Sequence, residues 1–150
     1  MRGMKKVFSG VFILGVLVMV GGFVTALQSE TAPTLGLVGG HLRPCPEKPN
    51  CVCSESSPDD KVHAIAPFST SNWLGLRLAI AAAGGRIDKD NGAYLHATFT
   101  SRVFRYVDDL ELRRDDAHGV IQVRSSSRVG YSGFGVNRKR VEAIRARLEP

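Results

Sequence analysis

The first hydrophobic pattern along the chain is an uninterrupted apolar run from Val7 to Leu27, which contains no charged side chain. Arg2, Lys5 and Lys6 precede this run. A basic start followed by an apolar core is typical of a signal peptide, although such cores are about 7–15 residues long. A membrane span needs about 20 residues, which matches this run, but four glycines make it less apolar. Residues 1–27 are therefore predicted to be a signal peptide or a membrane anchor.

The pattern changes after residue 60, where apolar and polar positions begin to alternate. Alternation with a period of two predicts half-buried strands. We expect strands over Ala93–Ser101, Phe104–Arg113 and Val120–Ser127, preceded by a shorter strand over Arg86–Asp88. Residues 62–66 also alternate and fit a short edge strand. The connections are as short as hairpin turns, which favours an antiparallel β-meander of about four strands.

Two segments fit helices. Trp73–Ala83 is apolar on most faces and ends at Gly84-Gly85, so it should be a largely buried helix. A second helix should begin near Asn137 as its cap and run to about Leu148. With both helices packed on one face of the meander, residues 61–150 are predicted to form an α+β domain. The other face should be exposed unless part of the same chain covers it.

Composition and charge narrow the class of partner. The chain has 150 residues, of which 43% are apolar and 23% charged, as in a globular protein. The net charge is +6, and the three basic residues of the N-terminal segment supply half of it, leaving +3. Because no aromatic and basic RNA-binding motif accompanies this small surplus, we predict no nucleic-acid partner.

The charge asymmetry around the apolar run predicts where the domain lies. The basic end of such a segment stays inside, so the rest of the chain crosses the membrane. We expect an exported protein of the cell envelope, with a periplasmic domain and the membrane as a partner. Residues 7–27 anchor it, or cleavage after Ala26, where the preceding residues fit the small-residue pattern, releases it.

Residues 28–60 are predicted to be a linker and a cysteine- and proline-rich loop. An exported chain with three cysteines should form one disulfide. We favour Cys45–Cys51, because Cys51 and Cys53 are too close in sequence for an unstrained bridge. Cys53 is then a free thiol or exchanges with its neighbours, and redox chemistry there would need a pKa below about 8.5. A zinc site with His41 or His63 fits the cysteine spacing poorly, so we predict no metal and no cofactor.

Three stretches of sequence resemble a known family. They are Pro44-Cys45-Pro46 with Pro49-Asn50-Cys51, residues 100–109, and residues 123–132 running into Gly135-Val136-Asn137-Arg138. The chain is similar over about residues 42–148 to the family called domain of unknown function 1499, found in bacteria and plastid-bearing organisms. The resemblance implies no established activity, but it implies a membrane or export segment before the domain. Family members tend to have Ser at the position of Cys53, which also supports Cys45 and Cys51 as the structural pair.

A glycine-rich loop between the last strand and the last helix is the first candidate site. Backbone N–H groups at a helix start bind anions, and glycines allow a phosphate or carboxylate to approach closely. The alternative is a turn that needs positive φ, surrounded by solvated charges. The predicted anion-binding residues are Arg124, Arg128, Gly133, Gly135 and Arg138.

A second candidate is an acid–base pair between His96 and Asp108 or Asp109. The sequence contains no nucleophile elbow or metal cluster to complete an enzyme site. We therefore expect an envelope module that binds an anionic small molecule, a lipid head group or an unidentified partner protein. The alternative is a small hydrolase or isomerase that uses His96 with Arg124 and Arg128, so the sequence leaves open whether the protein is an enzyme.

Overall fold

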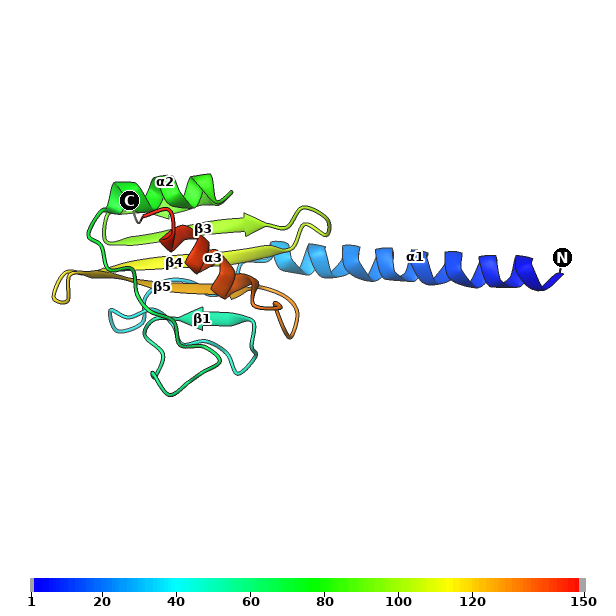
Figure 1. The fold of residues 1–150 in the computed structure, drawn as a ribbon, viewed down its shortest axis with the longest axis horizontal. Helices are drawn as coiled ribbons and strands as arrows, with labels where there is room; N and C mark the ends of the chain where they lie inside the picture. The colour runs from blue at the N-terminus through cyan, green and yellow to red at the C-terminus, as the bar shows by residue number, and fades with distance from the viewer. Residues whose placement is uncertain (1, 149–150) are drawn as a thin grey trace.

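The computed structural model describes residues 2–148; the last two residues of the predicted domain, 149–150, lie outside the described residues. Five strands form one antiparallel sheet in the order β1-β5-β4-β3-β2 (Figure 1). They are β1 (Cys51–Cys53), β2 (Arg86–Asp90), β3 (Tyr94–Thr100), β4 (Val107–Asp115) and β5 (Val120–Ser127). The helices are α1 (Arg2–Glu30), α2 (Trp73–Ala82) and α3 (Val136–Arg145). The predicted α+β class is confirmed.

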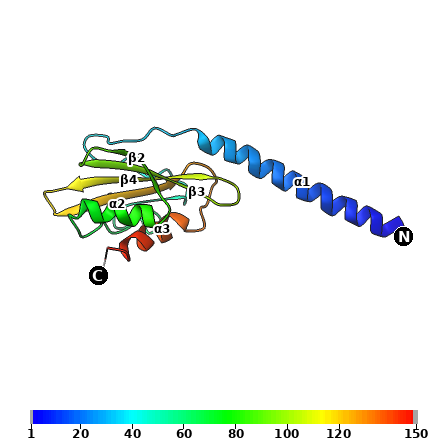
Figure 2. The same cartoon turned by 90° about the horizontal axis from the view of Figure 1, so that it is seen from above.

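Strands β2 to β5 form the predicted meander, and α2 and α3 cover one face of it (Figure 2). On that face the alternate residues of the strands are apolar, which lets them pack against the buried stripes of both helices. Leu110 and Leu112 of β4, Ile80 of α2 and Ile144 of α3 are fully buried in this core. The hydrophobic core therefore sits between the sheet and the helices.

Strand β1 comes from the segment that we predicted to be irregular. It pairs with β5, with Cys51 opposite Ser126 and Cys53 opposite Arg124. Three residues are too few to show a period of two, so alternation alone does not reveal this strand. No strand forms over 62–66, where Ala64 makes only an isolated bridge to Cys53.

The start of α3 differs from the prediction. Its cap is Gly135 in the left-handed conformation with φ of 73°, and Asn137 lies inside the helix. The Asn137 amide is buried and donates to the Asn50 carbonyl at 2.7 Å and to Ser127 Oγ at 2.9 Å. Asn137 therefore fastens the helix to the segment before β1 and to the end of β5, rather than capping it.

The face of the sheet opposite the helices is also buried. Residues 31–48, which we name the covering segment, run along this side of the sheet (Figure 2). His96, Thr98 and Ser126, which the sequence places on this face, are each less than a tenth exposed. The linker prediction therefore missed that this stretch is a structural layer.

Helix α1 extends away from the domain as a long rod (Figure 1). Its Val11–Glu30 part contains an 18-residue apolar window with a mean hydropathy of 2.3, and most side chains of that window are exposed. It is long and apolar enough to cross a membrane, and an N-terminal signal sequence can be equally long and apolar. The predicted apolar N-terminal helix is thus present.

Candidate functional site

Strand β4 supplies three charged residues to the covered face at alternate positions. The first, Asp109, accepts two hydrogen bonds from Arg128, at 2.9 Å from Nε and 2.8 Å from Nη2. His96 Nε2 on β3 lies 2.8 Å from the same carboxylate. Burial would raise the pKa of Asp109, but the bonds to His96 and Arg128 outweigh burial and lower it. Asp109 therefore stays ionised at neutral pH.

The second charged residue, Glu111, lies opposite both His96 and Arg124 in the sheet register. Its carboxylate accepts from Arg124 Nη1 at 2.9 Å and from the Tyr94 hydroxyl at 2.7 Å. It also accepts from the backbone N–H of Gly36 at 2.8 Å. Glu111 thus holds the covering segment to the middle of the sheet.

The third residue, Arg113, donates to Glu55 at 2.6 Å. Glu55 also accepts from the backbone N–H of Leu42 at 2.6 Å and lies 2.8 Å from His41 Nδ1. Burial would raise the pKa of Glu55, but the bonds to His41, Leu42 and Arg113 together lower it. The covering segment is therefore held by a second carboxylate, in a network where each buried charge has a partner.

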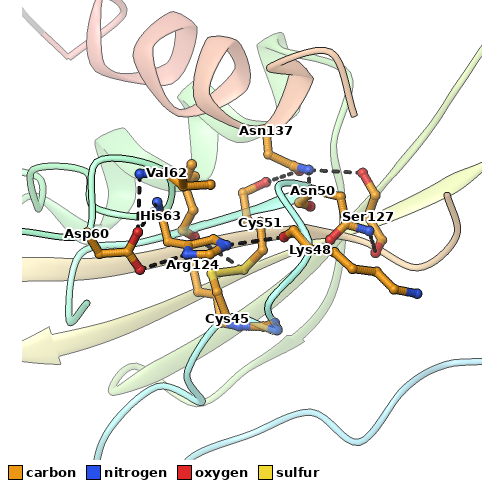
Figure 3. Close-up of a disulfide and its surroundings, with 12 residues drawn as sticks. Cys45, Lys48, Asn50, Cys51, Asp60, Val62, His63, Arg124, Ser127 and Asn137 are labelled. Carbon is orange, nitrogen blue, oxygen red and sulfur yellow. Dashed lines mark hydrogen bonds and ion pairs between the residues drawn. A yellow bond between two sulfur atoms is a disulfide. The ribbon is translucent and has the colours of Figure 1, made fainter. Parts of the chain in front are cut away.

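A disulfide between Cys45 and Cys51 fixes the covering segment to the sheet edge, as predicted (Figure 3). Its Cα atoms are 5.6 Å apart, and it joins the segment directly to β1. In the segment after β1, His63 lies 2.7 Å from Asp60 and 3.2 Å from the Lys48 carbonyl, which precedes β1. The chain around the disulfide is thereby fixed by several independent contacts.

A cavity of about 520 Å³ lies between the covering segment and the sheet. Its lining contains four basic side chains, Arg43, Lys48, Arg124 and Arg128, and one carboxylate, Asp109. Arg128 pairs with Asp109 and Arg124 pairs with Glu111, so Arg43 and Lys48 are the basic side chains of the lining that have no carboxylate partner among the described residues. We name this hollow the basic cavity.

Two arginines of the basic cavity have spare hydrogen-bonding capacity. The Nε atoms of Arg43 and Arg124 are buried and have no hydrogen-bond partner among the described residues. Buried polar groups in native proteins are nearly always paired, and leaving a donor unpaired costs about 1–3 kcal/mol. An anion in the cavity would satisfy such donors.

The structure separates the five predicted anion-binding residues into two groups. Arg124 and Arg128 line the basic cavity. Gly133, Gly135 and Arg138 instead line a hollow of about 50 Å³ beside the start of α3, where Arg138 donates to the Val62 carbonyl. The glycine-rich loop and the two strand arginines therefore do not form one site.

Sequence reasoning missed Arg43 and Lys48, because the covering segment has no periodic pattern that would show which side chains face the sheet. The one available signal was Cys45. A disulfide to the Cys51 region draws the residues on either side of Cys45 toward the strands.

The structure also separates the candidate acid–base residues. Asp108 points to the helix face and pairs with Arg140 of α3, as alternation along a strand requires. Asp109 and His96 are brought together on the other face. Asp109 lines the basic cavity, but His96 is not among its lining residues.

The third cysteine, Cys53, is a buried free thiol. Burial raises its pKa, which is opposite to the lowered value that a reactive redox thiol needs. The disulfide uses two of the three thiols that a zinc site would require. Over residues 2–148, no three histidine, cysteine or acidic side chains are grouped so that they could hold a metal ion.

Comparison with known proteins places the domain in a family. The model of the family described as "Protein of unknown function (DUF1499)" matches residues 41–148, which is most of the chain. No curated protein matches the chain, and no solved structure does either. The match begins within the covering segment and includes the disulfide, all five strands, α2 and α3. The chain therefore belongs to the DUF1499 family.

Proposed function

We propose that the protein is a membrane-anchored module of the cell envelope that binds a small anion in the basic cavity. The observation that carries this proposal is the pair of buried, unpartnered arginine Nε atoms at Arg43 and Arg124. A cavity of about 520 Å³ lies within the range of small-molecule sites, which is about 300–1,000 Å³. Phosphate and carboxylate are the groups whose geometry matches a guanidinium fork.

The contacts at the end of α1 favour an anchor over a cleaved signal peptide. The helix continues without interruption past Ala26, the predicted cleavage residue, to Glu30. Ala26 and Ser29 are buried, and Ser29 Oγ accepts from the backbone N–H of Val107. Arg128 Nη1 donates to the carbonyls of Ser29 and Glu30, as a cation at a helix C-terminus does. These contacts would partly cover the bond that a peptidase must cut.

The disulfide supports the envelope location. Such bonds persist in oxidising compartments and are rare in the cytosol. The basic residues before the apolar run predict that the domain lies on the far side of the membrane from them. An anchored domain in the periplasm satisfies both conditions.

The test uses the full-length protein in non-ionic detergent micelles, with its melting temperature measured against inorganic phosphate, citrate and glycerol phosphate. Arg43→Gln removes charge from the basic cavity, and Arg138→Gln is the matched control in the separate hollow. An anion at 100 times its Kd should add about 2.7 kcal/mol of stability. We expect a rise in melting temperature that Arg43→Gln loses and Arg138→Gln keeps. High salt should weaken the effect.

The proposal is contradicted if no anion raises the melting temperature, or if Arg138→Gln loses the effect as fully as Arg43→Gln does. A protein without any anion effect would instead fit a module that binds a partner protein. The hydrolase or isomerase alternative has weaker support, because His96 does not line the basic cavity and the lowered pKa of Asp109 makes it a poor general base.

A further inference from the structure

Two loops lie at the end of the sheet from which α1 leaves (Figures 1 and 2). One follows β3 and contains Val103, which is 79% exposed. The other follows β5 and contains Tyr131 and Phe134, which are 71% and 90% exposed. Large apolar side chains gathered at one end of a domain mark an interaction surface. We name these two segments, residues 101–106 and 128–135, the α1-side loops.

The first of these loops packs against α1 itself. The ring of Phe104 lies so close to Gly22 that a Cβ at this glycine would come within 2.7 Å of it. A cavity of about 230 Å³ between helix and loop is lined by Met19, Phe23 and Val103, among others. The contact lies eight residues before Glu30, the end of the helix. At a rise of about 1.5 Å per residue, this is about 12 Å along the helix axis.

This depth has a consequence if α1 spans the membrane, as proposed above. The uncharged run extends from Val7 to Leu27, and Gly22 lies inside it. A loop that contacts Gly22 cannot stay wholly in the water above the bilayer. It must lie at the level where the lipid head groups meet the acyl chains.

We infer that the α1-side loops enter the outer surface of the bilayer, so that the domain sits directly on a phospholipid membrane. The inference rests on the proposed anchoring by α1. Val103 and Phe134 insert apolar side chains, and Tyr131 lies at the level where aromatic residues are enriched. The partner is the phospholipid bilayer rather than a second protein.

The charges near these loops match a lipid surface. Arg102 and Arg105 flank the apolar tip of the first loop, and both are exposed. Basic side chains beside inserted residues are attracted to the phosphates of an anionic lipid surface. The turn after β4 lies at the opposite end of the sheet. Asp116 is exposed there, as expected for a turn that faces the solvent. The two ends therefore differ in the way that a domain seated on a membrane requires.

The test introduces single tryptophans into the full-length protein in a Trp73→Phe background. Val103→Trp and Phe134→Trp report on the two loops, and Ala117→Trp in the turn after β4 is the exposed control. Leu14→Trp reports on α1 itself. Each variant is placed in nanodiscs of phosphatidylcholine and phosphatidylglycerol, with or without bromine on the acyl chains near the head group, and tryptophan fluorescence is compared.

We expect brominated lipid to reduce the fluorescence of Leu14→Trp, Val103→Trp and Phe134→Trp and to leave Ala117→Trp unchanged. If Leu14→Trp is quenched while either loop tryptophan is not, the loops do not enter the bilayer and the inference is overturned, but the anchor stands. If Leu14→Trp itself escapes quenching, the anchor fails and the inference fails with it. Equal quenching of Ala117→Trp would show unspecific adsorption and would also overturn it.

Discussion

The two faces of the sheet are buried in different ways. On one face, apolar side chains of β3, β4 and β5 pack against α2 and α3. On the other, Asp109, Glu111 and Arg113 pair with charged and polar groups beneath the covering segment. The apolar face gains stability from area removed from water, which requires no exact partner. The polar face is stable only while each buried charge keeps its partner, so it is the face that can respond to a ligand.

Adjacent residues of β4 allow the largest test of this difference, because Glu111 and Leu112 are both fully buried on opposite faces. Glu111→Ala should cost about 3–5 kcal/mol, because Arg124 is left without its counter-charge. Leu112→Ala should cost about 2–5 kcal/mol through a cavity. Urea denaturation of the full-length protein in detergent measures both free energies of unfolding.

A paired replacement distinguishes the loss of a charge partner on the polar face from the loss of packing on the apolar face. Glu111→Leu combined with Arg124→Met removes both charges and should be closer to wild type than Glu111→Ala is. No second substitution should rescue Leu112→Ala in this manner. A cost below about 1 kcal/mol for Glu111→Ala would mean that the pair is not buried in the way described.

Loss of the disulfide is expected to have the next largest effect, and to act on the polar face alone. Cys45→Ser opens a loop of seven residues and should lower the free energy of unfolding by about 2 kcal/mol. It should also weaken anion binding, because Cys45 lines the basic cavity. Adding reductant should reproduce both losses in the wild type and change nothing further in Cys45→Ser. A Cys45→Ser variant with wild-type stability and anion binding would contradict this role.

Acid should weaken the polar face in a defined pH window. The pKa of Asp109 is lowered in the folded protein, and bonds to Gln122 and His118 lower that of Asp115 to about 2. A lowered folded pKa gives stability that is present above the unfolded value of about 3.9 and is lost as pH falls toward the folded value. When the melting temperature is measured from pH 6 to pH 2, it should therefore begin to decrease at about pH 4.

Two variants, one on each face of the sheet, test which face causes the loss of stability in acid. Asp115→Asn should show a smaller fall in melting temperature between pH 4 and pH 2, since one of the responsible carboxylates is gone. Leu112→Ala should lower the whole curve without changing its dependence on pH, because it alters only the apolar face. An unchanged acid response in Asp115→Asn would contradict the assignment.

The smallest effect is expected at Arg138, outside both buried layers. Its side chain makes one hydrogen bond, to the Val62 carbonyl, and it lines the separate hollow beside α3. Arg138→Ala should change the free energy of unfolding by no more than about 0.5 kcal/mol. A loss above 1 kcal/mol in the same urea assay would show that this corner is part of the folded layers.

The two faces also differ in how far the sequence predicts them. Alternation indicated β3, β4 and β5, and the apolar segment from Trp73 indicated α2, because both patterns are local and repeat along the chain. The polar face depends on contacts between distant residues, such as Gly36 with Glu111, 75 positions apart. No local pattern specifies which acid a given arginine meets.

The difference between local patterns and distant contacts also explains which residues of the candidate site the sequence predicted. Arg124 and Arg128 were predicted as anion-binding residues at the last strand and its end, and the structure puts both in the basic cavity. Arg43 and Lys48 lie in a stretch without periodicity, so their position depends on the disulfide and on the carboxylates that hold the covering segment. Gly133 and Gly135 line the separate hollow beside the start of α3, which buried Asn137 fixes to Asn50 and Ser127.

Hydrogen exchange at two backbone amides tests most directly whether residues 31–48 are a structural layer over a charged sheet face. Gly36 and Leu42 lie outside the regular strands and helices, yet their N–H groups donate to Glu111 and Glu55 at 2.8 and 2.6 Å. We expect both amides of the full-length protein in detergent to be strongly protected, and their protection to fall when the disulfide is reduced. Exchange at the rate of an unstructured peptide under oxidising conditions would show that the segment is a free linker, and the basic cavity would then not exist.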